Sequence, residues 1–480
     1  MLFNSFKFLL FFPFVTLIYF LVPHRFRWLW LLGMSCVFYM AFVPIYILIL
    51  AFTIVIDYIA GIIIERATSI QKKPFLILSL IANIGVLAFF KYYNFFTENI
   101  NSVFHFAGTD FSVPFLNIIL PIGLSFHTFQ AMSYTIEVYR GNQRAEKHFG
   151  IYALYVMFYP QLVAGPIERP QHMLHQFHAK HFFDSEKVIS GLRQMLWGFF
   201  KKTVIADRLG IYVDAVYLNY NDYSGLNLFI ATIFFALQIY ADFSAYSDIA
   251  LGSARVMGFD LMVNFNRPYA SKSITEFWRR WHISLSSWFN DYLFQPLTIA
   301  TRNWGKWGIA FALFLTFFLA GFWHGAGWTF IIYGSLHGLA LVYEFFTKKI
   351  RKKISKKIPS VIYNPASMLL TFLFVSMAMI FFRAKNIDVA LTVFGKIFSA
   401  NVFKNFIPQI DIDYTLYGYY SIVIAISSLI FMFYTEKKTD NQLEYFQPNR
   451  MQDIIFSSVV LTLILCFGVF NQTMFIYFQF

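Results

Sequence analysis

The chain has 480 residues, of which 58% are hydrophobic and only 13% are charged, and its formal net charge is +13. A soluble protein carries roughly 25% charged residues, so this composition excludes a soluble globular protein and indicates a chain that crosses a membrane several times. The positive charge lies in short loops between apolar runs and not in one compact basic domain. We therefore expect membrane lipid around the protein and no nucleic acid among its partners.

Apolar segments follow one another along the whole chain and predict an all-α, polytopic transmembrane bundle. The first segment lacks the small-residue cleavage site of a signal peptide, so we expect it to be a retained helix. We treat 1–480 as one integral-membrane domain, with N-terminal helices (1–110), a core (111–346) and a C-terminal part that begins with a basic loop (347–480). The apolar segments are 2–22, 28–43, 45–64, 74–90, 111–139, 149–164, 188–212, 226–252, 307–323, 327–346, 360–382, 415–434 and 454–470.

Basic clusters between these segments predict the orientation of the chain. Lys and Arg gather at 24–27, 65–73, 140–148 and 347–360, which we expect to be cytoplasmic. The stretch 92–110 has no Lys or Arg and is predicted to be a loop on the outside. The last basic cluster is compatible with a solvated loop and with a helix on anionic lipid headgroups.

The stretch 264–302 mixes Arg, Glu, Asp and His with Trp and Phe. It is too polar to face lipid and too apolar for a plain loop, so it predicts an interfacial or re-entrant segment packed against protein. Arg279 and Arg280 are suited to bind phosphates, because Arg forms paired hydrogen bonds with them. Interfacial arginines anchored by aromatic side chains are the alternative.

A single imidazole lies in the stretch GFWHGAGWTF, residues 321–330. The basic flanks at Lys306 and Lys348 predict a hairpin with its turn near His324, at about 27 Å along a helix from Lys306. Ionisable groups at membrane depth usually line a cavity, and a neutral imidazole there can act as a general base. A structural histidine bonded to a neighbouring helix is the alternative.

Two carboxylates, Asp242 and Asp248, lie inside the apolar segment 226–252. They are suited to orient a histidine or to pair with Arg255, and hydrogen bonding to neighbouring hydroxyl groups explains them equally well. The only cysteines, Cys36 and Cys466, lie in apolar segments. We expect small core residues there, and neither a disulfide nor a metal site.

Several stretches, in this order, resemble the membrane-bound O-acyltransferase family, and more narrowly its bacterial branch that O-acetylates polysaccharides. The most specific are FWRRWHISLSSW, which contains His282, and FWHGAGW, which contains His324. The supporting stretches are PIGLSFHTFQAMSYTIEVYRG, FYPQLVAGPIERP, QIYADFSAYSDIALGSARVMGF, NFNRPYASKS and the final YFQF.

The resemblance implies helices around a central tunnel in a bacterial cytoplasmic membrane. It implies an acyl thioester donor on the cytoplasmic side, either acetyl-CoA or phosphopantetheine on an acyl carrier, as substrate and not as a bound cofactor. The implied acceptor is a polysaccharide, with an exported SGNH-hydrolase-type partner. His324 matches the catalytic histidine, and His282 matches a second histidine on the way to it. The other residues expected to line the tunnel or bind substrate are Trp278, Arg279, Arg280, Asn290, Asp291, Asp242, Asp248 and Trp323.

The chain departs from the family pattern after His282, where Asn290-Asp291-Tyr292 replaces the usual Arg-Asp-Tyr. The group that polarises the thioester carbonyl is therefore open among His282, Asn290 and backbone N–H groups. Peptidoglycan O-acetylation and D-alanyl transfer to teichoic acid are alternatives within the family. A lipid or acyl transporter without bond chemistry is the alternative outside it, and it predicts internal repeats, which we do not find.

Overall fold

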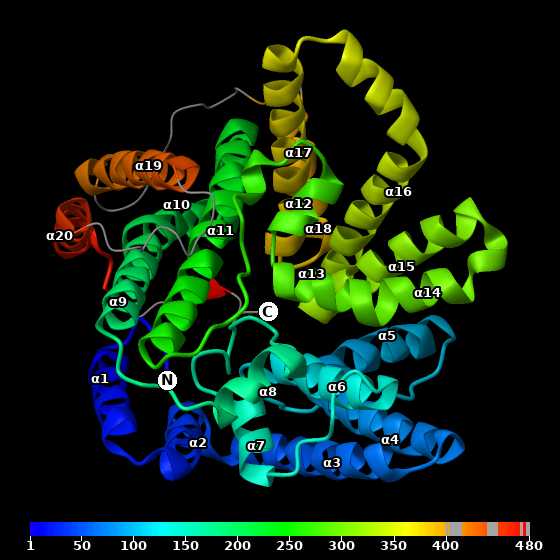
Figure 1. Ribbon diagram of the computed structural model, residues 1–480. Coiled ribbons are helices and arrows are strands. Elements are labelled where there is room, and N and C mark those ends of the chain that lie inside the picture. The colour runs from blue at the N-terminus through cyan, green and yellow to red at the C-terminus, as the bar shows by residue number, and fades with distance from the viewer. Residues whose placement is uncertain (400–401, 403–414, 439–449, 471–473, 477–480) are drawn as a thin grey trace. The chain divides into compact units, whose positions relative to one another are not determined.

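The computed structural model describes residues 1–399, 402, 415–438, 450–470 and 474–476, and the regular elements in these residues are helices (Figure 1). Seven of the helices described are long and apolar enough to cross a membrane. This confirms the prediction of an all-α, polytopic membrane protein. The chain forms two compact units: unit 1 comprises 1–195 and 249–262, and unit 2 comprises 196–248 and 263–480. The single membrane domain stays a prediction, and the C-terminal YFQF motif lies outside the described residues.

Unit 1 contains most of the N-terminal helices. Ser5 begins the first of them, because its hydroxyl accepts a hydrogen bond from the N–H of Phe8 at 3.3 Å. The helices of unit 1 are α1 (Phe6–Leu21), α2 (His24–Met40), α3 (Ile47–Arg66), α4 (Ser69–Leu87), α5 (Tyr93–Phe106), α6 (Leu124–Arg140), α7 (Phe149–Met157) and α8 (Pro170–His178). The helix α9 (Ser185–Phe200) begins in unit 1, and α11 (Gly225–Val256) ends in it.

The segment between α5 and α6 corrects two predictions. Most of the stretch expected as an outside loop is the helix α5, whereas the first part of the apolar segment 111–139 forms neither helix nor strand. Two asparagines of α5 support the irregular segment. Asn94 exchanges hydrogen bonds with both backbone groups of Leu116 at 2.8 and 3.0 Å, and Asn101 does the same with Val113 at 2.9 and 2.7 Å. These bonds satisfy backbone groups that no helix or strand would otherwise pair.

A buried carboxylate lies in the middle of the α3 span. Asp57 is fully buried and accepts hydrogen bonds from the hydroxyl of Ser79 at 2.6 Å and from the amide of Asn83 at 2.9 and 3.0 Å. Hydrocarbon offers no hydrogen-bond partners, so polar groups at this depth must find them on neighbouring helices. The bonds therefore tie α3 to α4 inside unit 1.

Unit 2 contains both predicted histidines, His282 and His324. The stretch 264–302 forms short helices separated by turns, and its interfacial or re-entrant position stays a prediction. The basic cluster 347–360 is helical as far as Lys357, as a direct continuation of α16. The helices of unit 2 are α10 (Asp207–Leu218), α12 (Ile274–Arg280), α13 (Ile283–Phe289), α14 (Gln295–Ala300), α15 (Lys306–His324), α16 (Trp328–Lys357), α17 (Ser360–Arg383), α18 (Ile387–Ile397), α19 (Thr415–Lys438) and α20 (Arg450–Phe467).

Helices α15 and α16 form the expected hairpin and pack side by side (Figure 1). Their backbones meet at two glycines. A Cβ on Gly334 would lie 2.3 Å from the carbonyl oxygen of Phe317 and 2.7 Å from the Cα of Gly321. A Cβ on Gly321 would lie 2.4 Å from the carbonyl oxygen of Phe330. Only glycine allows this approach, as in other small-residue contacts between membrane helices.

We predict that Gly334→Ala destabilises the protein by about 1–3 kcal/mol, because the new methyl group meets rigid backbone on α15 and the helices must separate. Thermal unfolding of the purified variant in detergent measures the loss. Gly33→Ala is the matched control, since the Cβ added at this helical glycine has nothing within 4 Å. Equal unfolding temperatures for the two variants would contradict the prediction.

Candidate active site

A cavity of about 820 Å³ lies within unit 2. Small-molecule sites typically measure about 300–1,000 Å³, so its size suits a substrate. Its wall consists of residues from α12, α13, the turn 290–294, α15 and α16. The polar members of the wall are Ser273, Thr275, Arg279, Ser286, Ser287, Asn290, Thr316, His324, Glu344, Lys348 and Arg351.

One face of α15 forms a continuous side of the cavity. Ile309, Leu313, Thr316, Ala320 and His324 all line it. They recur every three or four residues and therefore share one face of the helix. At about 1.5 Å per residue, this stripe is about 22 Å long. His324 lies at one end of it.

The other end of the stripe is positively charged. Trp307, near the start of α15, packs against Phe346 of α16 with ring centroids 5.1 Å apart. The next turn of α16, which contributes Lys348 and Arg351 to the wall, therefore lies at the opposite end of the stripe from His324. The cavity thus has a histidine at one end and two cations at the other.

Glu344 anchors α12 to α16. Its carboxylate accepts hydrogen bonds from the N–H of Ile274 at 2.8 Å, and from the N–H and hydroxyl of Thr275 at 3.0 and 2.7 Å. It also pairs with Arg351 at 3.1 Å. These bonds fix the start of the helix that brings Trp278 into the wall. The sequence interpretation missed Glu344 as a site residue, although a single acid inside an apolar helix was a usable signal.

His324 is the last residue of α15 and is only 5% exposed. Its ring is surrounded by aromatic rings, with centroid distances of 5.0 Å to Trp323, 5.4 Å to Phe382 and 6.2 Å to Tyr333. The helix ends here because Gly325 is extended, and a Cβ on it would overlap the ring of Phe330. The imidazole therefore meets the cavity in a largely apolar setting.

His282 is fully buried and does not contribute to the cavity wall among the described residues. It lies between α12 and α13 with left-handed backbone, φ 44° and ψ 56°, which is uncommon for a residue other than glycine. Its ring packs edge-on against Phe243 at 4.7 Å and lies 6.4 Å from the ring of Trp323. Burial lowers the pKa of His282 well below its ordinary value, and the neighbouring His324 lowers it further.

Asn264 holds the turn at His282 in place. Its carbonyl oxygen accepts a hydrogen bond from the N–H of Ile283 at 2.9 Å. Its side-chain oxygen accepts bonds from the N–H and hydroxyl of Ser284 at 3.3 and 2.6 Å, and its amide donates to the hydroxyl of Ser247 at 3.4 Å. The first two N–H groups of α13 are thereby occupied within the protein, which leaves them unavailable to polarise a substrate carbonyl.

The other predicted residues of this stretch fall into two groups. Trp278, Arg279 and Asn290 line the cavity. The wall as described does not include Arg280, Asp291 or Trp323. Arg280 pairs with Glu276 at 2.7 Å, the carboxylate of Asp291 accepts a hydrogen bond from Asn290 at 2.9 Å, and Trp323 contacts His324 through its ring.

Asp242 and Asp248 also lie outside the wall as described, which differs from their predicted place in the tunnel lining. Asp242 pairs with Lys202 at 2.7 Å, and Asp248 pairs with Lys201 at 2.5 Å. Lys202 further pairs with Asp207 at 2.9 Å. Both lysines belong to a π-helical turn, Lys201–Ala206, in which residues five positions apart share a face. Two lysines inside a predicted apolar segment were the signal that the sequence interpretation overlooked.

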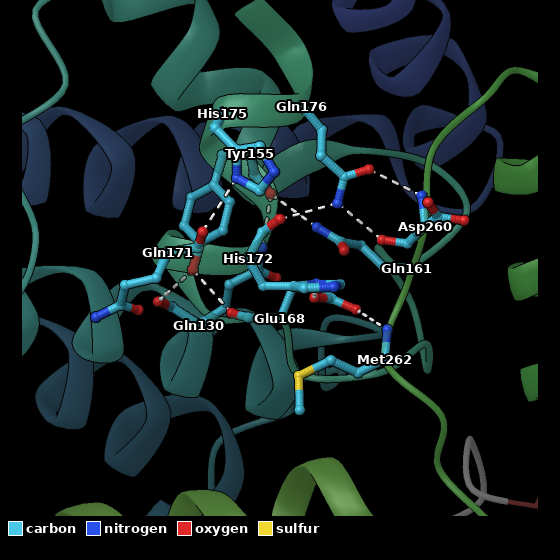
Figure 2. A network of polar contacts seen from close by, with 10 residues as sticks. All are labelled: Gln130, Tyr155, Gln161, Glu168, Gln171, His172, His175, Gln176, Asp260 and Met262. Atoms are coloured by element: carbon cyan, nitrogen blue, oxygen red, sulfur yellow. Dashed lines mark hydrogen bonds and ion pairs between the residues drawn. The ribbon is translucent and has the colours of Figure 1, made fainter. Parts of the chain in front are cut away.

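A second polar cluster lies in unit 1, around the stretch VAGPIERP (Figure 2). Glu168 is fully buried and accepts hydrogen bonds from the N–H of Met262 at 2.5 Å and from the ring of His172 at 2.7 Å. Burial raises the pKa of Glu168, and the hydrogen bond to this carboxylate raises the pKa of His172. The hydroxyl of Tyr155 donates to the carbonyl oxygen of Glu168 at 2.8 Å. These contacts join α7 and α8 to the segment after α11.

The sequence profile of the membrane-bound O-acyltransferase family matches residues 143–383, which contain the complete cavity wall. The chain belongs to the membrane-bound O-acyltransferase family. It is therefore an O-acyltransferase, which confirms the expected resemblance and sets aside the transporter alternative.

Relatives within the family act on cell-envelope polymers, as their names state. The chain is 38% identical to the probable alginate O-acetylase AlgI of Pseudomonas aeruginosa, over 83% of this chain and 75% of that protein. It is 35% identical to the peptidoglycan O-acetyltransferase of Helicobacter pylori, over 76% of this chain and 72% of that protein. It is 29% identical to the teichoic acid D-alanyltransferase of Bacillus subtilis, over 56% of this chain and 70% of that protein.

We predict that acid destabilises the protein in part through His282. The folded state keeps this imidazole neutral, whereas the unfolded chain binds a proton near pH 6.5. The free energy of unfolding therefore falls as the pH drops below about 6.5. His282→Asn suits the left-handed backbone and removes the titrating group, so its unfolding temperature should fall less than that of the wild type between about pH 7 and about pH 5. Parallel curves would refute the assignment.

We predict that Lys202→Met costs about 3–5 kcal/mol of stability, because it leaves two buried carboxylates without their ammonium partner. Thermal unfolding in detergent measures the loss, and adding Asp242→Asn should recover part of it. Asp214→Asn is the control: this carboxylate pairs with Arg383 at 2.7 Å but is 58% exposed. Its loss should cost less than about 1 kcal/mol. Similar losses at the buried and the exposed pair would count against the prediction.

Proposed function

We propose that this chain transfers an acetyl group from a cytoplasmic thioester donor to hydroxyl groups of an extracytoplasmic polysaccharide, with His324 as the general base. The observation that carries the proposal is a cavity with His324 at one end and Lys348 and Arg351 at the other. The names of the relatives, which include alginate and peptidoglycan O-acetyltransferases, support an acetyl group and a glycan acceptor.

The reaction needs one base and a dry site. His324 removes the proton from the acceptor hydroxyl as its oxygen attacks the thioester carbonyl. The carbon–sulfur bond then breaks, and the thiolate of the donor receives a proton from the imidazolium. The aromatic rings around His324 exclude water, which suppresses hydrolysis of the donor. We assign His282 a supporting role, because its ring lies outside the wall and reaches His324 through Trp323.

The basic end of the cavity suits the donor. Acetyl-CoA and phosphopantetheine on an acyl carrier both carry phosphates, and Arg and Lys bind phosphates through charge-assisted hydrogen bonds. Lys348, Arg351 and Arg279 all contribute to the wall. The thioester arm then extends along the face of α15 towards His324. The donor is a substrate in this proposal, and no resident cofactor is required.

We further propose that the protein resides in a bacterial cytoplasmic membrane and that an exported SGNH-hydrolase-type partner completes delivery to the polysaccharide. The orientation of the basic loops supports a cytoplasmic donor side. Peptidoglycan is the second candidate acceptor, on the strength of the Helicobacter pylori relative.

We predict that His324→Ala lowers acetyl transfer by at least about 100-fold, the usual contribution of a general base. Purified protein in lipid nanodiscs, supplied with radiolabelled acetyl-CoA and either alginate-type or peptidoglycan oligosaccharides, measures the transfer and identifies the acceptor. His105→Gln changes an exposed histidine of α5 and should leave the rate unchanged. Transfer at the wild-type rate by His324→Ala would disprove the assignment, provided that its unfolding temperature is also unchanged.

A further inference from the structure

His337 is a buried histidine that the proposed mechanism does not use. It lies on α16, is fully buried, and accepts a hydrogen bond at Nδ1 from the indole N–H of Trp278 at 3.2 Å. A ring nitrogen that accepts a hydrogen bond carries no proton, so the neutral ring has its hydrogen on Nε2. The direction of donation in the Trp278–His337 pair is therefore fixed.

This bond determines what Trp278 presents to the cavity. Trp278 lines the cavity, and its ring packs edge-on against Phe317 of α15 at 4.9 Å. Because its N–H is directed at His337, the indole of Trp278 presents carbon atoms to the cavity. Without the acceptor, the N–H would be a buried donor in need of another partner, and buried donors without partners are rare.

His337 also supports the ring beside His324. It packs against Tyr333 with ring centroids 4.7 Å apart, and against Phe374 on α17 at 5.5 Å. Tyr333 in turn meets the ring of His324 edge-on, at 6.2 Å and 83°. One side chain therefore contacts both a residue of the cavity wall and the aromatic neighbour of His324.

We propose that His337 is a positioning residue for acyl transfer: its Nδ1 holds Trp278 in the cavity wall, and its ring holds Tyr333 against His324. The inference rests on the proposed role of His324. His337 touches no reacting atom and acts through its two neighbours. A small displacement of positioned groups is enough to lower a rate by about 100-fold.

Two substitutions separate the hydrogen bond from simple packing. His337→Leu keeps an apolar side chain but removes the acceptor, and we expect kcat for acetyl transfer to fall by at least about 10-fold while the donor KM changes little. His337→Asn keeps an oxygen close to the position of Nδ1 and should restore most of the rate. Trp278→Phe removes the donor of the same hydrogen bond. The fall in kcat of the double variant should therefore be no larger than that of His337→Leu alone.

A control variant and a spectroscopic measurement test the Trp278–His337 pair independently of the other substitutions. His127→Leu replaces another buried histidine, in unit 1, and should leave kcat unchanged. Fluorine NMR of protein labelled with fluorotryptophan, with Trp278 assigned from its missing signal in Trp278→Phe, reports the pair without any enzymatic assay. The signal should move in His337→Leu and return in His337→Asn. An unmoved signal, or additive losses in the double variant, would overturn the inference. Full transfer by His324→Ala would instead refute the proposed function and leave the fluorine result intact.

Discussion

The close crossing of α15 and α16 is the contact on which the site depends. Gly321 and Gly334 let the two backbones meet without intervening side chains, which aligns the stripe of α15 that ends in His324 with the basic turn of α16. Shape and charge distribution of the cavity both follow from this crossing. A wider separation would leave each helix intact and yet remove the wall that they build together.

Hydrocarbon around the helices imposes a second requirement, because it offers no partner to a buried polar group. Three buried carboxylates described above find such partners on other elements. Asp57 is bonded to Asn83, Asp242 pairs with Lys202, and Glu344 bonds the start of α12. These contacts connect helices that apolar packing alone would leave free to slide, because lipid and leucine are equally apolar.

The sequence was sufficient to predict the α15–α16 hairpin and the position of His324 at its turn, because basic flanks mark the two ends of a pair of hydrophobic spans. The sequence was insufficient where the backbone forms its hydrogen bonds with a side chain and not with other backbone groups. Asn94 and Asn101 bond to the first part of the segment 111–139, whose apolar sequence predicts a helix. Nothing in the sequence around the two asparagines indicates these bonds. The partners of Asp242 and Asp248 were also missed, because Lys202 and Lys201 lie on a distant part of the chain and only their place in an apolar segment marks them. His282 was predicted on the way to His324 and lies beside it, outside the wall.

The π-helical turn at Lys201–Ala206 makes the pairing of Lys202 depend on the number of residues in this helix. Such a turn is an α-helix that has absorbed one additional residue, and here that residue brings Lys202 and Asp207 onto one face. Loss of a single residue would restore an ordinary α-helix and rotate everything beyond it by about 100°. A deletion inside this turn would therefore separate the ammonium group of Lys202 from the carboxylate of Asp207, whereas a deletion in a loop would leave the pair intact.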